Sequence, residues 1–563
     1  MTGLASSDRP ADRNGQLHVR WLGRVPYHES AVVQEAMFSR GQHDHLLLLE
    51  HDHVFTHGPH ADLENNIRID PSVSGIPLVA VDRGGDVTYH GPGQLTGYPL
   101  LTRPGKGSLA HVTAVEDLLI AVLRRCGLSD VGRLSGFPGV WVAPAGPSPA
   151  KIAAIGVRLA HGRTKHGFNL NNTNDLSYMR EHIVACGIRE HGVTSLAEQG
   201  IDIAMADLVG IVADEATARL GGGQSTRSDV TDALAPTDLA PFSRGHGAGQ
   251  PIRLRSRAAQ VGLDEGLELS ERKPDWLRAP VRHDASVLSM RRMLRELDLV
   301  TVCEDAGCPN LSECWSEGTA TFMVLGERCT RKCGFCLVDT RRPVEPDTDE
   351  PARVAEAVNR LRLDHAVLTM VARDDLADGG MAHVARCVTA IRSARPECRI
   401  ETLISDVKGD MAALDILVDA GPDIVNHNIE TVPRLQRMVR PSAGYARSLA
   451  VLAHAGSRGV VTKSSLMVGI GETDDEVDAT LIDLATLGVD IVTIGQYLRP
   501  TDHHLPVQRW VNPAQFERWA QRGQELGIGH VEASPLTRSS YHAKGAADAV
   551  SPVTVTLGAR GSV

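Results

Sequence analysis

The sequence has no apolar run approaching the ~20 residues that a membrane-spanning helix needs. Its opening segment, MTGLASSDRPADRNG, lacks the apolar core of a signal peptide. Positive charge is not in excess either: the formal net charge is −11, which argues against a general nucleic-acid footprint. We therefore expect a cytoplasmic chain without a membrane segment or a nucleic-acid partner. In such a chain, cysteines are more often metal ligands or catalysts than disulfides.

No internal repeat is evident, and a single core is excluded by length. With 563 residues, we expect two or three domains of roughly 100–200 residues each. Residues 221–250 are rich in Gly, Ser, Thr, Asp and Pro and have no apolar period, which predicts a flexible linker. The predicted domains on its two sides are residues 15–220 and 251–563.

Six of the ten cysteines lie close together in the second predicted domain. They form two triplets, C-x4-C-x5-C and C-x3-C-x2-C, with a short strand between them: Cys303, Cys308 and Cys314, then Cys329, Cys333 and Cys336. Thiolate sulfur is the soft ligand that holds iron–sulfur clusters. A cubane cluster has four irons to ligate and each triplet supplies three thiolates, so one iron per cluster is left for another ligand.

The second domain alternates strand-like runs with amphipathic helix-like segments. The strand candidates are residues 321–326, 365–371, 399–405, 423–430, 461–469 and 490–497. This alternation indicates a parallel sheet, and about six repeats favour a partial TIM-type barrel over a complete one of eight. Polar residues follow the strands, where such barrels carry their chemistry: Arg373, Asp374, Asp375, Asn426, Asn428, Glu430, Gln496 and Tyr497.

The first domain reads as α+β, with strand-like runs at 45–50, 75–82 and 151–171 and helices at 112–127 and 206–221. Three features could carry chemistry: the glycine-rich RGGDVTYHGPGQ, Lys151 at a strand start, and Cys186. Positive neighbours of Cys186 would favour its thiolate. Taken singly, each feature has a plain alternative: a hairpin, a solvated lysine and a small core residue. For the histidine-rich run at 43–60, we favour surface or pocket-lining side chains over a metal site.

Taken together, RGGDVTYHGPGQ, KIAAIG and ACGI resemble the lipoyl(octanoyl) transferase family over about the first 220 residues. The resemblance implies a lipoate/biotin ligase-like α+β fold. It also implies that Cys186 accepts an octanoyl group from octanoyl-acyl carrier protein as a thioester, that Lys151 is the general base, and that the acyl group passes to a lipoyl-domain lysine. The implied acyl pocket consists of Arg83, Gly84, Gly85, Asp86, Val87, Thr88, Tyr89, His90, Ala154, Ile155, Gly156, Gly167, Phe168 and Asn169.

The two cysteine triplets, with HNIETVPRLQRMVRP, KSSLMVGIGET and RSSYHA downstream, resemble lipoyl synthase of the radical S-adenosylmethionine superfamily over roughly residues 250–550. The resemblance implies two [4Fe–4S] clusters and S-adenosylmethionine as cofactors. Cys329, Cys333 and Cys336 would hold the cluster that binds S-adenosylmethionine. Cys303, Cys308, Cys314 and Ser540 would hold an auxiliary cluster that supplies sulfur. Further contacts to S-adenosylmethionine would come from Gly379, Gly380 and Glu430.

Joined in one chain, these halves imply consecutive steps of lipoate assembly: octanoyl transfer, then insertion of sulfur at C6 and C8. The implied partners are octanoyl-acyl carrier protein, the lipoyl domains of 2-oxoacid dehydrogenases, the glycine cleavage H protein and an electron donor. One alternative is that only the radical half is active and the first half merely binds lipoyl domains. Another is an electron carrier, although the dense spacing C-x2-C-x2-C-x3-C-P is absent. An ATP-dependent ligase is a third, but it has no use for the cysteine.

Overall fold

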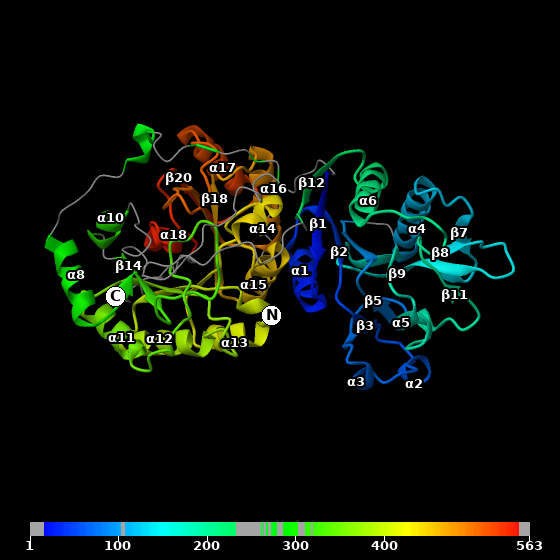
Figure 1. Cartoon of the computed structure of the whole chain (residues 1–563), viewed down its shortest axis with the longest axis horizontal. Helices are drawn as coiled ribbons and strands as arrows, with labels where there is room; N and C mark the ends of the chain where they lie inside the picture. Colours follow the sequence, from blue (N-terminus) through cyan, green and yellow to red (C-terminus); the bar gives the residue numbers. More distant parts are fainter. Residues whose placement is uncertain are drawn as a thin grey trace, which may run out of the picture.

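The computed structural model describes residues 16–102, 107–231, 261, 263, 266–267, 272–278, 285–301, 310–316 and 319–550. In these ranges the chain forms two domains that lie side by side, with the N-terminal domain on the right of Figure 1 and the C-terminal domain on the left. No helix in the described ranges is long and apolar enough to cross a bilayer.

The N-terminal domain is built on a mixed sheet whose strand order is β12-β1-β2-β6-β10-β9-β8-β7, with β11 added to β9. The strand-like run predicted at 151–171 is two strands: β9 and β10 pair antiparallel around a turn at His161 and Gly162, both with positive φ. The strands are β1 Leu17–Arg24, β2 Asp44–Glu50, β6 Gln94–Leu100, β7 Val131–Leu134, β8 Phe137–Val142, β9 Ala150–Ala160, β10 Arg163–Asn171, β11 Gly192–Val193 and β12 Ser225–Asp229.

A smaller sheet, in the order β4-β3-β5, lies beside the main one and carries the glycine-rich segment. Its strands are β3 Val54–His57, β4 Leu78–Ala80 and β5 Thr88–His90. Two long helices match the predicted ones and bury apolar faces in the domain core: α4 Ser108–Arg125 and α6 Met205–Arg219. Helix α1, Tyr27–Arg40, lies apart from them at the boundary with the second domain (Figure 1). The remaining helices are short: α2 Leu63–Asn66, α3 Pro71–Ser74, α5 Ser177–Arg180 and the single turn η1 Ala185–Gly187.

The structure differs from the predicted linker at its start. Residues 225–229 form strand β12, which pairs in parallel with β1. Backbone hydrogen bonds hold this polar edge strand, so hydrophobic periodicity gave no sign of it. The next residues lead toward the second domain, where the Thr231 hydroxyl donates to the Arg434 carbonyl at 3.1 Å. The rest of the predicted linker, from residue 232, lies outside the described residues.

The C-terminal domain is a partial barrel, as predicted. Strands β14 to β20 run parallel in sequence order, and β13 adds antiparallel to β14. The order ends at β13 and β20, and no pairing between these two closes the sheet in the described ranges. Both end strands were missed by the sequence prediction. The strands are β13 Val300–Thr301, β14 Thr319–Val324, β15 His365–Met370, β16 Arg399–Leu403, β17 Ile424–Asn426, β18 Val461–Val468, β19 Ile491–Gln496 and β20 His530–Ser534.

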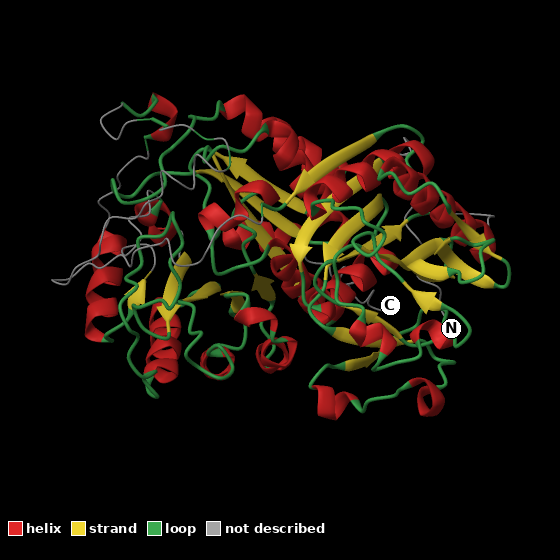
Figure 2. Cartoon of the chain, turned by 45° about the vertical axis from the view of Figure 1, so that its right-hand side comes forward, coloured by secondary structure: helices red, strands yellow, loops and turns green. Residues whose placement is uncertain are grey.

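Helices alternate with these strands and flank the sheet (Figure 2). They are α8 Ala285–Glu296, α10 Leu311–Ser316, α11 Glu350–Leu361, α12 Met381–Ala394, α13 Met411–Asp419, α14 Gln436–Val439, α15 Tyr445–Ser457, α16 Asp474–Leu487, α17 Pro513–Glu525 and α18 Ala543–Val550, with single turns η3 Asp275–Leu277, η4 Val407–Gly409 and η5 Pro433–Leu435. Most of α15 is buried on all sides. A helix buried in this way has a partner on each face: its own sheet covers one face, and α1 of the first domain covers the other.

Besides the core of each domain, one apolar cluster contains residues of both domains. Val33 and Met37 of α1 belong to the same buried cluster as Leu449 of α15 and Leu481 of α16. An ion pair is buried beside this cluster: Arg20 Nε lies 2.9 Å from Asp483 Oδ1, and both side chains are 1% exposed. The domains are thus packed together, in addition to being connected by the chain.

Histidines of the predicted surface or pocket group lie at this boundary. His45 is fully buried, with Nε2 3.4 Å from Asp483 Oδ1. His51 is also buried and bonds the Val25 carbonyl and the Tyr98 hydroxyl. These two side chains are therefore buried with hydrogen-bond partners, so of the predicted surface or pocket-lining positions the surface one is wrong for them.

Candidate active sites

Lys151 is held at the start of β9 with strands on both sides. Its partners across the sheet are Trp141 on β8 and Val193 on β11. The side chain is buried, and its ammonium lies 4.9 Å from the centre of the Trp141 ring. Among the residues that the structure describes, no carboxylate lies within ion-pair distance of this ammonium. A buried amine without a carboxylate partner is available for proton transfer to a reacting group.

Cys186 lies in the turn η1 with φ of 57°, a conformation that residues other than glycine rarely adopt. Its backbone N–H donates to the Val87 carbonyl at 2.8 Å, and its half-buried thiol is free of any disulfide. Strained backbone of this kind persists only when its surroundings hold it, and it clusters at functional sites. The chain after the turn enters β11, which pairs with β9 at Lys151. This topology brings the two predicted catalytic residues to one side of the domain.

Arg83 is the first residue of the glycine-rich segment, and Cys186 is among the groups that act on its charge. Its guanidinium donates to the Thr56 carbonyl at 2.7 Å and to the Thr56 hydroxyl at 3.0 Å. Burial lowers the pKa of Arg83 and the Cys186 thiol acts in the opposite direction, so the two groups are neighbours. On β9, a Cβ at Gly156 would lie 2.9 Å from the Cδ of Arg83. Glycine at position 156 therefore leaves space for the arginine.

The other predicted acyl-pocket residues divide between two faces of their strands. Val87 and Tyr89 are buried in a small apolar core, and Phe168 is buried in the main core, where its ring fills the space beside Gly97. Asn169 lies on the opposite face of β10 from Phe168 and accepts a hydrogen bond from Ala154 N–H at 3.2 Å. Val87, Tyr89 and Phe168 therefore pack in the cores behind the predicted pocket, whereas Asn169 lies on the face that can contact a ligand.

The loop from Cys329 to Cys336 directly follows β14 and is anchored along its length. Gly334 N–H donates to the Val439 carbonyl, and Leu505 N–H donates to the Gly334 carbonyl, both at 2.9 Å. None of the three thiols of the loop forms a disulfide. Burial raises the pKa of Cys333, and Cys336 and Cys329 raise it further.

This donor set fits a cubane cluster. No group of three Cys, His, Asp or Glu side chains in the described ranges surrounds a single ion. In a cubane, however, each thiolate binds a different iron, so the three sulfurs do not have to converge on one point. Three half-buried thiols on one loop, none of them in a disulfide, are therefore suited to three irons of one cluster. The fourth iron is left for a ligand that is not a cysteine.

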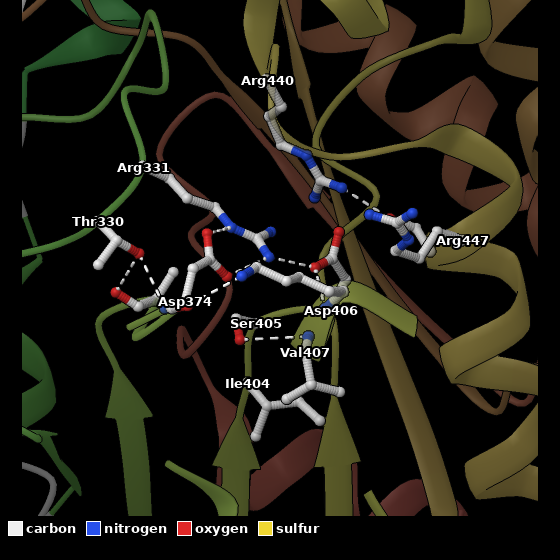
Figure 3. A network of polar contacts seen from close by, with 12 residues as sticks. Thr330, Arg331, Asp374, Ile404, Ser405, Asp406, Val407, Arg440 and Arg447 are labelled. Carbon is white, nitrogen blue, oxygen red and sulfur yellow. Dashed lines mark hydrogen bonds and ion pairs between the residues drawn. The ribbon is translucent and has the colours of Figure 1, made fainter. Parts of the chain in front are cut away.

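An arginine inside the cysteine motif fixes this loop. Arg331 forms a two-bond pair with Asp374 after β15, with N–O distances of 2.8 Å, and its Nη2 lies 2.6 Å from Asp406 Oδ1 after β16 (Figure 3). Its backbone N–H also points to Cys329 Sγ at 3.4 Å. Sequence reasoning found Asp374 by its position after a strand but missed Arg331 and Asp406. The place of Arg331 between two cysteines was the available signal.

One cavity of about 500 Å³ brings the two predicted cluster sites together. Its lining includes Cys336 of the second triplet, Cys314 of the first, Ser540 and Glu430. These residues come from α10, the loop after β14, the segment after β17 and the segment after β20. The other two predicted auxiliary ligands, Cys303 and Cys308, lie outside the described residues.

The RSSY segment is anchored through its first serine. The Ser539 hydroxyl donates to Asn428 Oδ1 at 2.9 Å and accepts from Asn426 Nδ2 at 3.0 Å. Asn426 also donates to Glu401, which forms a fully buried ion pair with Lys463. Ser540 is thereby presented to the cavity from a fixed support, a role for Ser539 that the sequence did not reveal.

A second contact joins the RSSY segment to α10, the helix of Cys314. The Tyr541 hydroxyl donates to Glu313 Oε2 at 3.3 Å. Nearby, Asn310 Nδ2 donates to the Leu536 carbonyl at 2.6 Å. Ser540 and Cys314 therefore approach the cavity from two connected elements.

The predicted contacts to S-adenosylmethionine occupy two places. Glu430 lines the cavity with φ of 65°, and its carboxylate accepts from Asn428 Nδ2 at 3.1 Å. Gly379 and Gly380, with φ of 61° and 92°, stand at the start of α12 and pack against Val407 and Leu325. Neither glycine is among the residues that line the cavity.

Comparison with known proteins assigns each domain. The family model for the lipoyl protein ligase A/B catalytic domain matches residues 26–217, and the radical SAM superfamily model matches residues 323–484. Lipoyl synthase of Rubrobacter xylanophilus is 53% identical over 273 residues, 48% of this chain and 85% of that protein. The C-terminal half of the chain belongs to the lipoyl synthase family. Lipoyl synthase of Methylococcus capsulatus is 49% identical over 312 residues, 55% of this chain and 95% of that protein.

Solved structures are similar to the two domains separately. A bi-partite lipoate protein ligase from Thermoplasma acidophilum has a TM-score of 0.33 and 17% identity, over 38% of this chain and 88% of that one. The FeFe-hydrogenase maturase of Carboxydothermus hydrogenoformans has a TM-score of 0.33 and 13% identity, over 53% of this chain and 68% of that one.

The lipoyl synthase half therefore stands beside a domain of the lipoate ligase and transferase class, as the sequence predicts. The chain is a two-domain enzyme of lipoate biosynthesis, and S-adenosylmethionine and two iron–sulfur clusters are its cofactors. Nothing in these comparisons favours the alternative that the first half is only a binding module. The relative from Methylococcus is matched over nearly its whole length, so a domain like the N-terminal one has no room in it.

Proposed function

We propose that the N-terminal domain transfers an octanoyl group from octanoyl-acyl carrier protein to the lysine of a lipoyl domain. Cys186 Sγ attacks the carrier thioester, Lys151 takes the thiol proton, and the proton returns to the departing carrier thiolate. The lipoyl-domain amine then attacks the acyl-Cys186, which forms the amide and frees the thiol. The strained turn at Cys186, its neighbour Arg83 and the buried Lys151 support this assignment.

The C-terminal domain then acts on the protein-bound octanoyl chain. Cys329, Cys333 and Cys336 would hold the cluster that binds S-adenosylmethionine, with contacts from Gly379, Gly380 and Glu430. The auxiliary cluster would be held by Cys303, Cys308, Cys314 and Ser540. When bound, these groups supply the radical chemistry and the sulfur that enters at C6 and C8. The chain's own residues orient the two sites toward one cavity and shield the reacting carbons from water.

The observation that carries the proposal is the shared cavity. Cys336 and Glu430 represent the S-adenosylmethionine site, and Cys314 and Ser540 represent the sulfur source. A chain entering between them has a hydrogen-abstracting site on one side and a sulfur donor on the other. Serine is a hard and weak ligand for iron compared with thiolate, which suits a cluster that must open.

The test is to incubate the reconstituted protein with octanoyl-acyl carrier protein, a lipoyl domain, S-adenosylmethionine and a reductant, and to weigh the lipoyl domain. The expected product carries the octanoyl group plus two sulfurs. If the lipoyl domain does not gain the octanoyl mass, octanoyl transfer is refuted. If it gains the octanoyl mass but no sulfur, sulfur insertion is refuted. Lipoyl domains of 2-oxoacid dehydrogenases and the glycine cleavage H protein are the acceptors to compare, and a protein electron donor can replace the chemical reductant.

Two variants decide between this proposal and its alternative. Cys186→Ser should abolish octanoyl transfer while the sulfur-insertion half still acts on a pre-octanoylated lipoyl domain. A trapped acyl-Cys186, found by mass spectrometry of the wild type, would exclude both the binding module and an ATP-dependent ligase. Full transfer by Cys186→Ser would instead show that Cys186 is not the nucleophile, whereas the absence of any transfer by the wild type would support the module alternative.

A further inference from the structure

The N-terminal domain touches the C-terminal domain close to the cysteine loop. The contact is made by the first turn of α1 on the segment after β16. His28 Nε2 lies 3.2 Å from the Gly409 carbonyl oxygen, and Glu29 Oε1 accepts from Arg447 Nε of α15 at 2.7 Å. The Glu29 side chain is 3% exposed. Glu29 is therefore buried at this contact, beside an exposed His28 and a partly exposed Arg447.

The segment that α1 touches is an unusual turn. Val407, Lys408 and Gly409 all have positive φ, at 40°, 53° and 80°. Consecutive residues in this region are strained and need support from their surroundings. A Cβ at Gly409 would lie 2.4 Å from Glu29 Oε1, so only glycine lets the first domain approach so closely. Glu29 therefore packs directly against the backbone of the turn at Gly409.

The same turn holds the cysteine loop from its other side. Asp406 precedes the turn and caps it by accepting from Lys408 N–H at 3.1 Å. Its Oδ1 lies 2.6 Å from Arg331 Nη2, and Arg331 is the residue whose backbone N–H points to Cys329 Sγ. Two ion pairs thus lie between α1 of the first domain and the cluster ligands: Glu29 with Arg447, and Asp406 with Arg331. Figure 3 shows Arg331, Asp406 and Arg447 of this set.

Arg447 binds Glu29 directly and is near enough to Asp406 to affect its pKa. Burial opposes the ionisation of Asp406, but Arg331 lowers its pKa below the usual value, with smaller contributions from His427 and Arg447. Burial raises the pKa of Glu29, and Asp406 acts in the same direction, whereas Arg447 acts against it. Arg447 therefore lowers the pKa of both carboxylates, and Glu29 is the one that binds it directly.

We propose that Glu29 is a positioning residue for the radical cluster loop: by binding Arg447, it leaves Asp406 to Arg331, so the docked transferase domain sets the geometry around Cys329. This inference rests on the proposed assignment of Cys329, Cys333 and Cys336 as cluster ligands. Without the Glu29 charge, Asp406 is the remaining anion near Arg447. Two arginines then compete for one carboxylate, and the hold of Arg331 on the loop weakens.

The test compares Glu29→Gln with the double variant Glu29→Gln, Arg447→Gln in the full-length protein. Hydrogen exchange of peptides covering residues 329–336 is measured on protein without clusters, and release of iron to a chelator is measured on reconstituted protein. For Glu29→Gln we expect both rates to rise by roughly three- to thirtyfold, the range of mutations that alter coupling between sites. In the double variant the competing cation is gone, so both rates should return to within about twofold of wild type.

The matched control is Glu35→Gln, the same substitution on the same helix. Glu35 pairs with Lys165 of its own domain and has no contact with the 406–409 turn. It should leave both rates unchanged, and octanoyl transfer should be unchanged in all three variants. If Glu29→Gln matches Glu35→Gln, or if the double variant is no better than the single one, the inference is wrong. If wild-type protein takes up no S-adenosylmethionine-binding cluster, the proposed function itself fails, and the exchange data on cluster-free protein still decide the link.

Discussion

The buried ion pair between Arg20 and Asp483 offers the sharpest test of how the two domains are held together. Arg20 Nε contacts both carboxylate oxygens of Asp483, at 2.9 and 3.0 Å. The Tyr445 hydroxyl donates to the same carboxylate at 2.8 Å. The pair lies between β1 of the first domain and α16 of the second. The perturbation is Asp483→Ala, which removes the shared anion.

The expected loss follows from burial. Removing one partner of a buried pair costs about 3–5 kcal/mol, because the other charge stays buried without compensation. The Tyr445 hydroxyl also loses its acceptor, and such a group costs about 1–3 kcal/mol when nothing replaces it. The two contributions overlap because they share one carboxylate. We therefore expect about 4 kcal/mol, which lowers the equilibrium constant for docking by roughly a thousandfold.

The assay is urea unfolding combined with hydrogen exchange of peptides from α1 and α16. Asp483→Ala should separate the unfolding of the two domains and expose both helices to exchange. Asp478→Ala is the matched control. Asp478 lies on α16, the same helix as Asp483, and pairs with Arg522 of α17 near the surface. Exposed pairs of this kind contribute about 0–1 kcal/mol. A loss for Asp483→Ala no larger than that for Asp478→Ala would refute the reasoning. Recovery in the double variant Arg20→Leu, Asp483→Leu would support it.

Three further predictions concern the active sites and acid stability. Lys151→Met should lower octanoyl transfer by about 10²–10⁴-fold while the urea midpoint stays near wild type; equal transfer rates would rule out Lys151 as the base. Ser539→Ala should reduce sulfur insertion relative to S-adenosylmethionine cleavage, because Ser540 loses its support, and an unchanged product ratio would contradict this. Lys463 holds the pKa of Glu401 at about 2 despite burial. The ionised Glu401 therefore adds its full stabilisation to the folded protein above the unfolded pKa of ~4.3, and this contribution is lost as pH falls toward 2. In acid unfolding measurements, a Lys463→Met variant should lack this transition.

Much of the architecture could be predicted because local patterns carry it. The β–α alternation and the apolar helix faces of the second domain come from residue periodicity, and the structure confirms the partial barrel. Strands β13 and β20 were not predicted, for a physical reason. Val300–Thr301 is too short to show alternation, and His530–Ser534 is half-buried with polar side chains. β12 is equally polar, so only its pairing with β1 reveals it.

The cluster loop was predictable because cysteine spacing is itself a chemical signature. Its supports were not, because they come from residues that are distant in sequence. Arg331 meets Asp406 only once β14 and β16 lie in one sheet. Likewise, Ser539 meets Asn426 only after β17 and β20 have taken their places. Glu29 and Arg447 are further apart still, and each alone looks like an ordinary helix surface residue.

The shared core of α1, α15 and α16 also bears on how the acyl group travels. Because the domains are packed face to face, the enzyme does not fold over to carry a product from one catalytic centre to the next. On the proposed function, the acylated lipoyl domain has to move instead, leaving the first entrance and presenting its lysine arm at the second. A lipoyl domain that stays beside the enzyme between the two steps would meet the second site at a raised effective concentration.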